Sequence, residues 1–226
     1  MPKFNYSGAR PLRLLPALLL WLPALAVQAA PEEMTIDPGH TFPTFEVRHL
    51  NVATQRGRFN RTQGRVSLDL EAGSGSAQIS IASDSVDTGN QELDKLLRTR
   101  SYFNVRDYPQ INFKSTAMEF ADGKPALIHG ELTFLGESRP VDLKVLYFGC
   151  SRLPFVGNRC GADLMAKFKR SDFGMNTMLG FVSDEVTMQI QVEAVKGRPV
   201  EPPPPAGEPA PESPAGSPAA TPPTRP

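Results

Sequence analysis

The two cysteines are the clearest candidates for a reactive pair in this 226-residue chain. Cys150 and Cys160 are separated by the nine residues SRLPFVGNR. A disulfide and a metal site are the alternatives for such a pair, but there is no CxxC spacing and no histidine nearby to complete a metal site. In an exported protein we therefore favour a disulfide, which would stabilise the fold by about 3 kcal/mol or less.

The other reactive side chains do not form a recognisable catalytic motif. The chain has no GxSxG, HExxH, Walker or GxGxxG sequence, and the three histidines His40, His49 and His129 are scattered along it. A histidine metal site would need them to converge with carboxylates. Asp84 and Asp87 are three residues apart, but they precede a turn sequence in which aspartate commonly caps the backbone. We predict no catalytic residue, no metal, no covalent cofactor and no enzymatic activity.

The elements that carry these residues are mostly strands. Between residues 30 and 197 apolar and polar residues alternate with period two, most clearly at 186–194. Short turn sequences such as AGSGS at 72–76 and Asp122-Gly123 separate the runs. We predict eight strands, near 41–49, 62–71, 76–83, 110–121, 126–135, 139–149, 162–171 and 184–196.

One segment has helical spacing instead. Leu93, Leu96 and Leu97 fall on one face of a helix predicted over 90–99, with Asn90 as its N-cap. A shorter helical turn is predicted near 52–57. Eight antiparallel strands with one helix between the third and fourth indicate an all-β barrel or sandwich. A barrel of this size is filled by side chains or holds one small ligand.

Both ends of the chain differ from this central domain. Residues 1–29 have three basic residues before the apolar run 14–27 and the small residues of VQA, which is typical of a cleaved secretory signal; an uncleaved anchor is the alternative. We expect a periplasmic or secreted protein with no membrane span once the signal is removed. Residues 198–226 hold 12 of the 23 prolines and are predicted to be a disordered tail.

The charge balance narrows the range of partners. The whole chain has 24 basic and 24 acidic residues, and removing the three basic residues of the signal leaves 21 against 24, a net charge of −3. This balance excludes a nucleic-acid-binding protein of the usual basic type, and it argues against electrostatic docking on an anionic lipid surface. Whether the chain forms a homodimer is left open.

Two apolar segments do not fit regular elements. The stretch YFNVRDYPQINF at 102–113 joins the predicted helix to a strand, and SDFGMNTMLGFVSDE at 171–185 is an unusually apolar loop. Because connections normally lie on the surface, such a loop requires a partner. It either plugs one end of the barrel or forms the lip of a pocket.

The order of these pieces resembles the YceI-like, or polyisoprenoid-binding, family. YPQINFKST at 108–116, GELTFLG at 130–136 and RSDFGM at 170–175 carry the resemblance, which spans residues 34–196. It implies an exported lipocalin-like barrel at 30–197 that holds an isoprenoid quinone or a polyprenyl phosphate non-covalently. The chain departs from the family pattern at Thr41, where serine is common, and at Leu96, where histidine is often found.

The resemblance gives a set of candidate ligand contacts. The expected lining residues are Phe42, Phe45, Leu93, Leu97, Phe103, Phe113, Phe134, Phe168, Phe173 and Met175. The candidates for contact with a polar head group are Arg100, Tyr102, Arg106 and Tyr108, because arginine suits phosphate. The function expected is transport, storage or sequestration of the lipid. The alternative is an extracytoplasmic protein-interaction module that uses the apolar loop 173–182 and the proline-rich tail.

Overall fold

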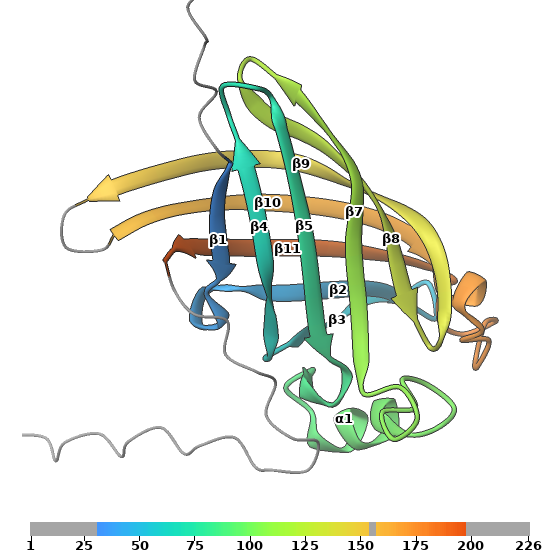
Figure 1. The fold of residues 1–226 in the computed structure, drawn as a ribbon. Coiled ribbons are helices and arrows are strands. Elements are labelled where there is room, and N and C mark those ends of the chain that lie inside the picture. The colour runs from blue at the N-terminus through green and yellow to red at the C-terminus, as the bar shows by residue number, and fades with distance from the viewer. Residues whose placement is uncertain (1–30, 154–156, 198–226) are drawn as a thin grey trace, which may run out of the picture.

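The computed structural model describes residues 31–153 and 157–197, and its main feature is an antiparallel sheet that curls round and closes (Figure 1). The predicted signal and tail lie outside the described residues. The strands are β1 Glu32–Ile36, β2 Phe42–His49, β3 Ala53–Phe59, β4 Thr62–Asp69, β5 Ser74–Ala82, β6 Val86–Asp87, β7 Gln110–Ala121, β8 Lys124–Phe134, β9 Glu137–Leu153, β10 Gly157–Lys169 and β11 Glu185–Lys196. The helical elements are α1 Gln91–Arg98 and the 3-10 turns η1 Pro38–His40, η2 Ser83–Ser85 and η3 Arg170–Phe173.

Eight of the described strands form the closed barrel that the sequence predicts. Their order is β1-β4-β5-β7-β8-β9-β10-β11, and β1 pairs again with β11, where Ile36 lies opposite Ala194. All of these pairings are antiparallel. Closure leaves the ring without a free sheet edge, which distinguishes a barrel from a sandwich.

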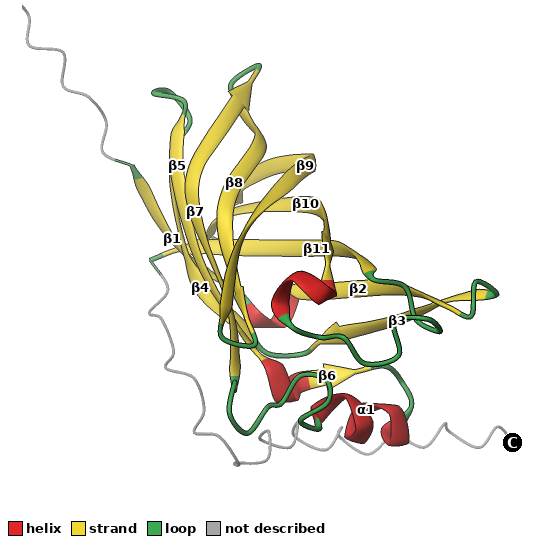
Figure 2. Cartoon of the chain, turned by 90° about the vertical axis from the view of Figure 1, so that its right-hand side faces the viewer, coloured by secondary structure: helices red, strands yellow, loops and turns green. Residues whose placement is uncertain are grey.

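The first strand of the barrel differs from the prediction. The chain enters the ring through β1, which was not predicted. The predicted strand at 41–49 is β2, which pairs with β11 only along the first half of β11, where Phe42 lies opposite Gln191. Beyond that pairing, β2 and β3 form a hairpin that projects past the barrel wall (Figure 2). The two-residue strand β6 then pairs with the end of β3.

The helical turn predicted near 52–57 is wrong, because this segment belongs to β3. Gly57 is buried, and a Cβ atom built on it would lie 2.4 Å from Cζ of Phe45. The aromatic ring of the neighbouring strand therefore fills the place of an inward side chain. Without that side chain, the sequence of β3 lacks the apolar alternation by which a strand is recognised.

The predicted helix is confirmed as α1. The Asn90 side chain caps it, since its Oδ1 accepts hydrogen bonds from the backbone N–H groups of Glu92 (3.0 Å) and Leu93 (3.3 Å). Arg98, in the last turn, donates to the carbonyl oxygens of Asp84 (2.8 Å) and Val86 (2.7 Å). These bonds fix the helix at the end of the barrel where β5 finishes and β7 begins (Figure 1).

Six phenylalanine rings fill the α1 end of the barrel. They contact one another in a chain with ring centroids 5.4 to 6.1 Å apart, from Phe45 and Phe59 through Phe103 and Phe134 to Phe173 and Phe168. A second, smaller cluster of Met34, Ile36, Leu68 and Ala194 packs where β1 meets β4 and β11. Between them lies the space described next.

Candidate binding cavity

The barrel encloses a cavity of about 230 Å³ to which all eight of its strands contribute side chains. The period-two pattern explains the lining, because alternate residues of each strand point inward, as Val141, Leu143 and Val145 do on β9. The polar side chains on the wall are Thr41, Thr62, Tyr102 and Arg170. The cavity is therefore an almost wholly apolar space with sparse polar groups.

Seven of the ten residues expected to line a cavity do so. They are Phe45, Leu97, Phe103, Phe113, Phe134, Phe168 and Met175. Their contact with a ligand stays a prediction. In the case of Phe113, the ring lies over Gly130, where an added Cβ would come within 2.3 Å of Cζ. Because Gly130 has no side chain, the Phe113 ring can occupy this position in the cavity wall.

The other three residues lie outside the lining, each for a structural reason. Phe42 falls on the outer face of β2, because Pro43 and the alternate residues after it face inward; the Arg58 guanidinium lies 5.1 Å from its ring centroid. Leu93 is half-buried on α1, one turn before the lining residue Leu97. Phe173 is 1% exposed and packs against the lining residues Phe134 and Phe168, with ring centroids 5.7 and 5.4 Å away.

The four head-group candidates do not come together. Tyr102 lines the cavity, whereas Arg100, Arg106 and Tyr108 are exposed in the loop that follows α1. Sequence reasoning also missed Arg170, which is 3% exposed and lies on the cavity wall. The sequence did contain a signal for its burial, because Arg170 stands directly before the apolar loop. A long cationic side chain at that position has few directions in which it can reach water.

The buried Arg170 side chain holds the apolar loop through its backbone. Its Nε donates to the carbonyl oxygen of Ser183 (2.9 Å), its Nη1 to those of Met175 (3.1 Å) and Thr177 (2.7 Å), and its Nη2 to that of Val182 (3.0 Å). Burial lowers the pKa of Arg170 from its ordinary value, with the charges of nearby groups opposing that shift. Four carbonyl acceptors offset the loss of water around the cation.

The apolar segment predicted at 171–185 is partly buried and partly exposed. Its first part turns inward, with Phe173 and Met175 buried. Its second part faces outward, with Met178 49%, Leu179 41% and Phe181 55% exposed. The buried first part agrees with the plug alternative, whereas Met178, Leu179 and Phe181 do not line the cavity.

The wall offers few polar atoms for a ligand. The Thr41 hydroxyl is already used, since it accepts from the Glu193 N–H (3.1 Å) and donates to the Glu193 carbonyl (3.3 Å). Within the described part of the chain, the buried Oγ1 of Thr62 has no hydrogen-bond partner. A ligand that is mostly hydrocarbon matches this surface better than a polar one.

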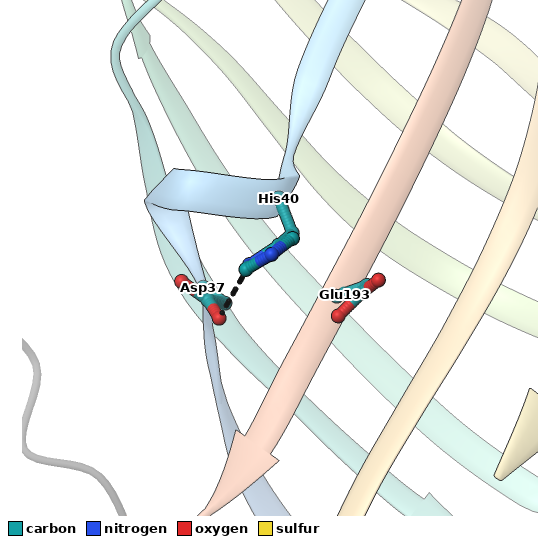
Figure 3. A group of neighbouring side chains, drawn as sticks. All are labelled: Asp37, His40 and Glu193. Carbon is teal, nitrogen blue, oxygen red and sulfur yellow. Dashed lines mark hydrogen bonds and ion pairs between the residues drawn. The ribbon is translucent and has the colours of Figure 1, made fainter. Parts of the chain in front are cut away.

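A separate cluster of charged side chains lies beside η1 (Figure 3). Asp37, His40 and Glu193 each place one potential ligand atom within 4.8 Å of the others, and His40 Nδ1 is 3.0 Å from Asp37 Oδ2. Arg159 pairs with both carboxylates, at 3.1 Å from Asp37, and its hydrogen bond to Glu193 raises the pKa of Arg159. The guanidinium already supplies the positive charge, so this is an ion-pair network that ties η1 to β10 and β11.

The two carboxylates considered for catalysis have structural roles. Asp87 accepts from the backbone N–H of Gly89 (2.9 Å) in the predicted turn, and the hydrogen bond from the Asn60 side chain is the main cause of its lowered pKa. Asp84 pairs with Arg61. These contacts fix the backbone around η2.

The predicted disulfide is confirmed between Cys150 and Cys160, which lie directly opposite each other on β9 and β10. Cys160 also lines the cavity, whereas Cys150 is exposed. Within 31–153 and 157–197, the chain has no helix of the length and apolarity needed to cross a bilayer.

Comparison with known proteins finds relatives by sequence and by fold. It is 35% identical over 158 residues to a UPF0312 protein of Pseudomonas paraeruginosa (70% of this chain, 82% of the relative). It is 34% identical over 181 residues to Protein YceI of Salmonella newport (80% and 94%). BcnA of Burkholderia cenocepacia superposes with a TM-score of 0.62 at 25% identity, over 71% of this chain and 99% of BcnA.

The family comparison covers the whole barrel. The model of the YceI-like domain matches residues 34–194, from β1 through nearly all of β11. The ring of eight strands, the capped helix and the apolar interior all lie within this range. This chain belongs to the YceI-like family.

Proposed function

We propose that the protein is an exported carrier that holds one isoprenoid lipid, a quinone or a polyprenyl phosphate, inside its barrel for transport, storage or sequestration. The observation that carries this proposal is the apolar cavity of about 230 Å³. A cavity of about 150 Å³ is large enough for benzene, so this space can hold a longer hydrocarbon segment.

The energy of binding follows from the hydrocarbon alone. Each methylene moved from water to a dry cavity contributes about 0.8 kcal/mol, so ten buried carbons supply roughly 8 kcal/mol before the costs of association. Polar groups are then needed only to orient the head. Tyr102 is the head-group candidate on the wall, and the cationic Arg170 lies on the same wall.

Family membership supports an isoprenoid as the ligand class. A domain from Saccharophagus degradans with the same fold is described as a polyisoprenoid binding domain, at 18% identity and a TM-score of 0.56, over 72% of this chain and 98% of that domain. At 18% identity this comparison supports the fold alone. The argument for the ligand class therefore rests on the apolar cavity of this chain.

The disulfide supports export. Such bonds persist in oxidising compartments and are rare in the cytosol, which agrees with the secretory signal proposed at residues 1–29. The mass of the mature chain tests this directly, since cleavage after Ala29 predicts a new N-terminus at Ala30.

Lipid analysis tests the proposal. Protein purified without detergent is examined by native mass spectrometry and, after organic extraction, by lipid mass spectrometry. We expect a bound species whose extracted mass increases in five-carbon units between homologous ligands. A clean apo mass with an empty extract would contradict the proposal.

A further inference from the structure

Exposed apolar side chains gather at one tip of the molecule, formed by the β2–β3 turn and the second half of the loop before β11. We call this surface the apolar tip; it consists of Leu50, Val52, Met178, Leu179 and Phe181, which are 51%, 82%, 49%, 41% and 55% exposed. The two segments are joined, because the Leu50 N–H donates to the Phe181 carbonyl (2.6 Å).

Two residues of the apolar tip have a backbone conformation that is unusual for large apolar residues. Leu50 (φ 54°) and Met178 (φ 58°) both adopt the left-handed region, which favours glycine and asparagine. Their side chains are about half exposed, so they gain little burial in return. A conformational cost without a packing benefit indicates that the exposed apolar groups themselves are used.

Both segments of the apolar tip lie close in sequence to residues of the cavity wall. Val47, three residues before Leu50, and Val182, directly after Phe181, both line the cavity. The β2–β3 hairpin projects beyond the barrel (Figure 2), so the tip can meet a flat surface without obstruction from the ring.

The charges around the apolar tip fit a phospholipid surface. Residues 47–55 contain Arg48 and His49 and no acidic residue, and residues 173–183 contain no charged residue at all. Apolar side chains at the boundary of head groups and acyl chains, with a cation beside the lipid phosphates, form a common arrangement for peripheral binding.

We propose that the apolar tip docks on a phospholipid bilayer and connects the cavity with the membrane from which the ligand is taken or to which it is delivered. This inference rests on the proposed function. The net charge of −3 expected for the processed chain provides no overall attraction to anionic lipid, so apolar insertion must supply most of the affinity. Binding should therefore depend only weakly on salt.

Vesicle flotation tests the docking alone. Vesicles of phosphatidylethanolamine and phosphatidylglycerol without isoprenoid are mixed with the processed chain, which begins at Ala30, and with its Val52→Asp, Phe181→Asp variant. We expect the variant to lose at least about tenfold in partition, since each carboxylate must be kept out of the apolar boundary. The matched control is Leu146→Asp, Tyr147→Asp on β9, where the side chains are 56% and 65% exposed.

A second variant distinguishes a loss of docking from a loss of folding. Leu50→Asn suits the left-handed turn, so it should keep or raise the thermal midpoint while still weakening flotation. Equal flotation of wild type and both tip variants, or an equal loss in the β9 control, would overturn the proposal. All variants begin at Ala30, so the apolar run 14–27 does not contribute to flotation.

The two proposals fail in different ways. A chain that floats but yields no extractable lipid contradicts the carrier function and supports docking. A lipid-loaded chain that does not float overturns docking alone, and the apolar tip would then be a surface for a protein partner.

Discussion

Filling the cavity with a single side chain is the most direct test of its role. Ala166 lies on β10 between the inward residues Leu164 and Phe168, is 4% exposed and lines the cavity. Ala166→Phe would place a benzene ring in the space proposed for the lipid chain. We expect the variant to fold and to lose most of its lipid.

The cavity volume sets the size of the effect. A benzene-sized group occupies a cavity of about 150 Å³, or roughly two-thirds of the 230 Å³ found here. If ten buried carbons contribute roughly 8 kcal/mol, excluding two-thirds of them removes about 5 kcal/mol. The dissociation constant should then rise by roughly three to four powers of ten.

Stability should respond much less than binding. Overpacking a filled core costs about 1 to 3 kcal/mol, but a ring that enters open space meets little resistance. We therefore expect a change of less than about 2 kcal/mol in the free energy of unfolding, measured by denaturant titration. Ala117→Phe is the matched control, because Ala117 is exposed on β7 and the same ring would stay outside the barrel.

The assay compares lipid extracted per mole of protein and the affinity for a fluorescent naphthalene probe. Unchanged lipid content and probe affinity in Ala166→Phe would refute the assignment of the cavity as the binding site. A large loss of stability together with normal binding would show that this part of the interior is packed core.

Three further predictions concern stability. Arg170→Met removes the donors that hold four loop carbonyls and should lower the free energy of unfolding by about 3 kcal/mol or more, with faster proteolysis of the loop; unchanged proteolysis would contradict this. Hydrogen bonds to Glu119 and Asp142 raise the pKa of His129, so its contribution is complete below about pH 6.5 and is lost as the pH rises through the raised pKa. His129→Gln should flatten the pH dependence of the thermal midpoint in that window, and an unaltered profile would count against a stabilising interaction of His129 with Glu119 and Asp142. Cys150→Ser should cost about 3 kcal/mol or less and leave lipid content intact, whereas lost lipid would mean that the disulfide shapes the cavity.

The sequence predicted most of the fold because the local signals were strong. Alternation at 186–194 follows from a strand with one face toward the barrel interior, and β11 has this form. The cap at Asn90 depends only on neighbouring backbone groups, so it could be recognised without tertiary information. β3 could not, because Gly57 has no side chain and its inward place is filled by Phe45 from another strand.

The site was only partly predictable for the same kind of reason. An aromatic residue in a strand indicates burial, but the register of the strand decides whether its side chain faces inward or outward. Phe42 faces outward, whereas the next residue, Pro43, faces inward. The charge of Arg170 suggested solvent exposure, yet four carbonyls from a loop that folds back over it make burial favourable.

The sequence by itself determined the all-β class, the single capped helix, the cysteine pair and the apolar character of the interior, since these depend on residue type and short-range spacing. Only the tertiary structure decided that β1 closes the ring, that Phe173 and Met175 are buried while Met178, Leu179 and Phe181 are exposed, and that Leu50 lies beside Phe181. These features depend on contacts between residues far apart in the chain. Such contacts are set by strand register and barrel closure, which no local pattern encodes.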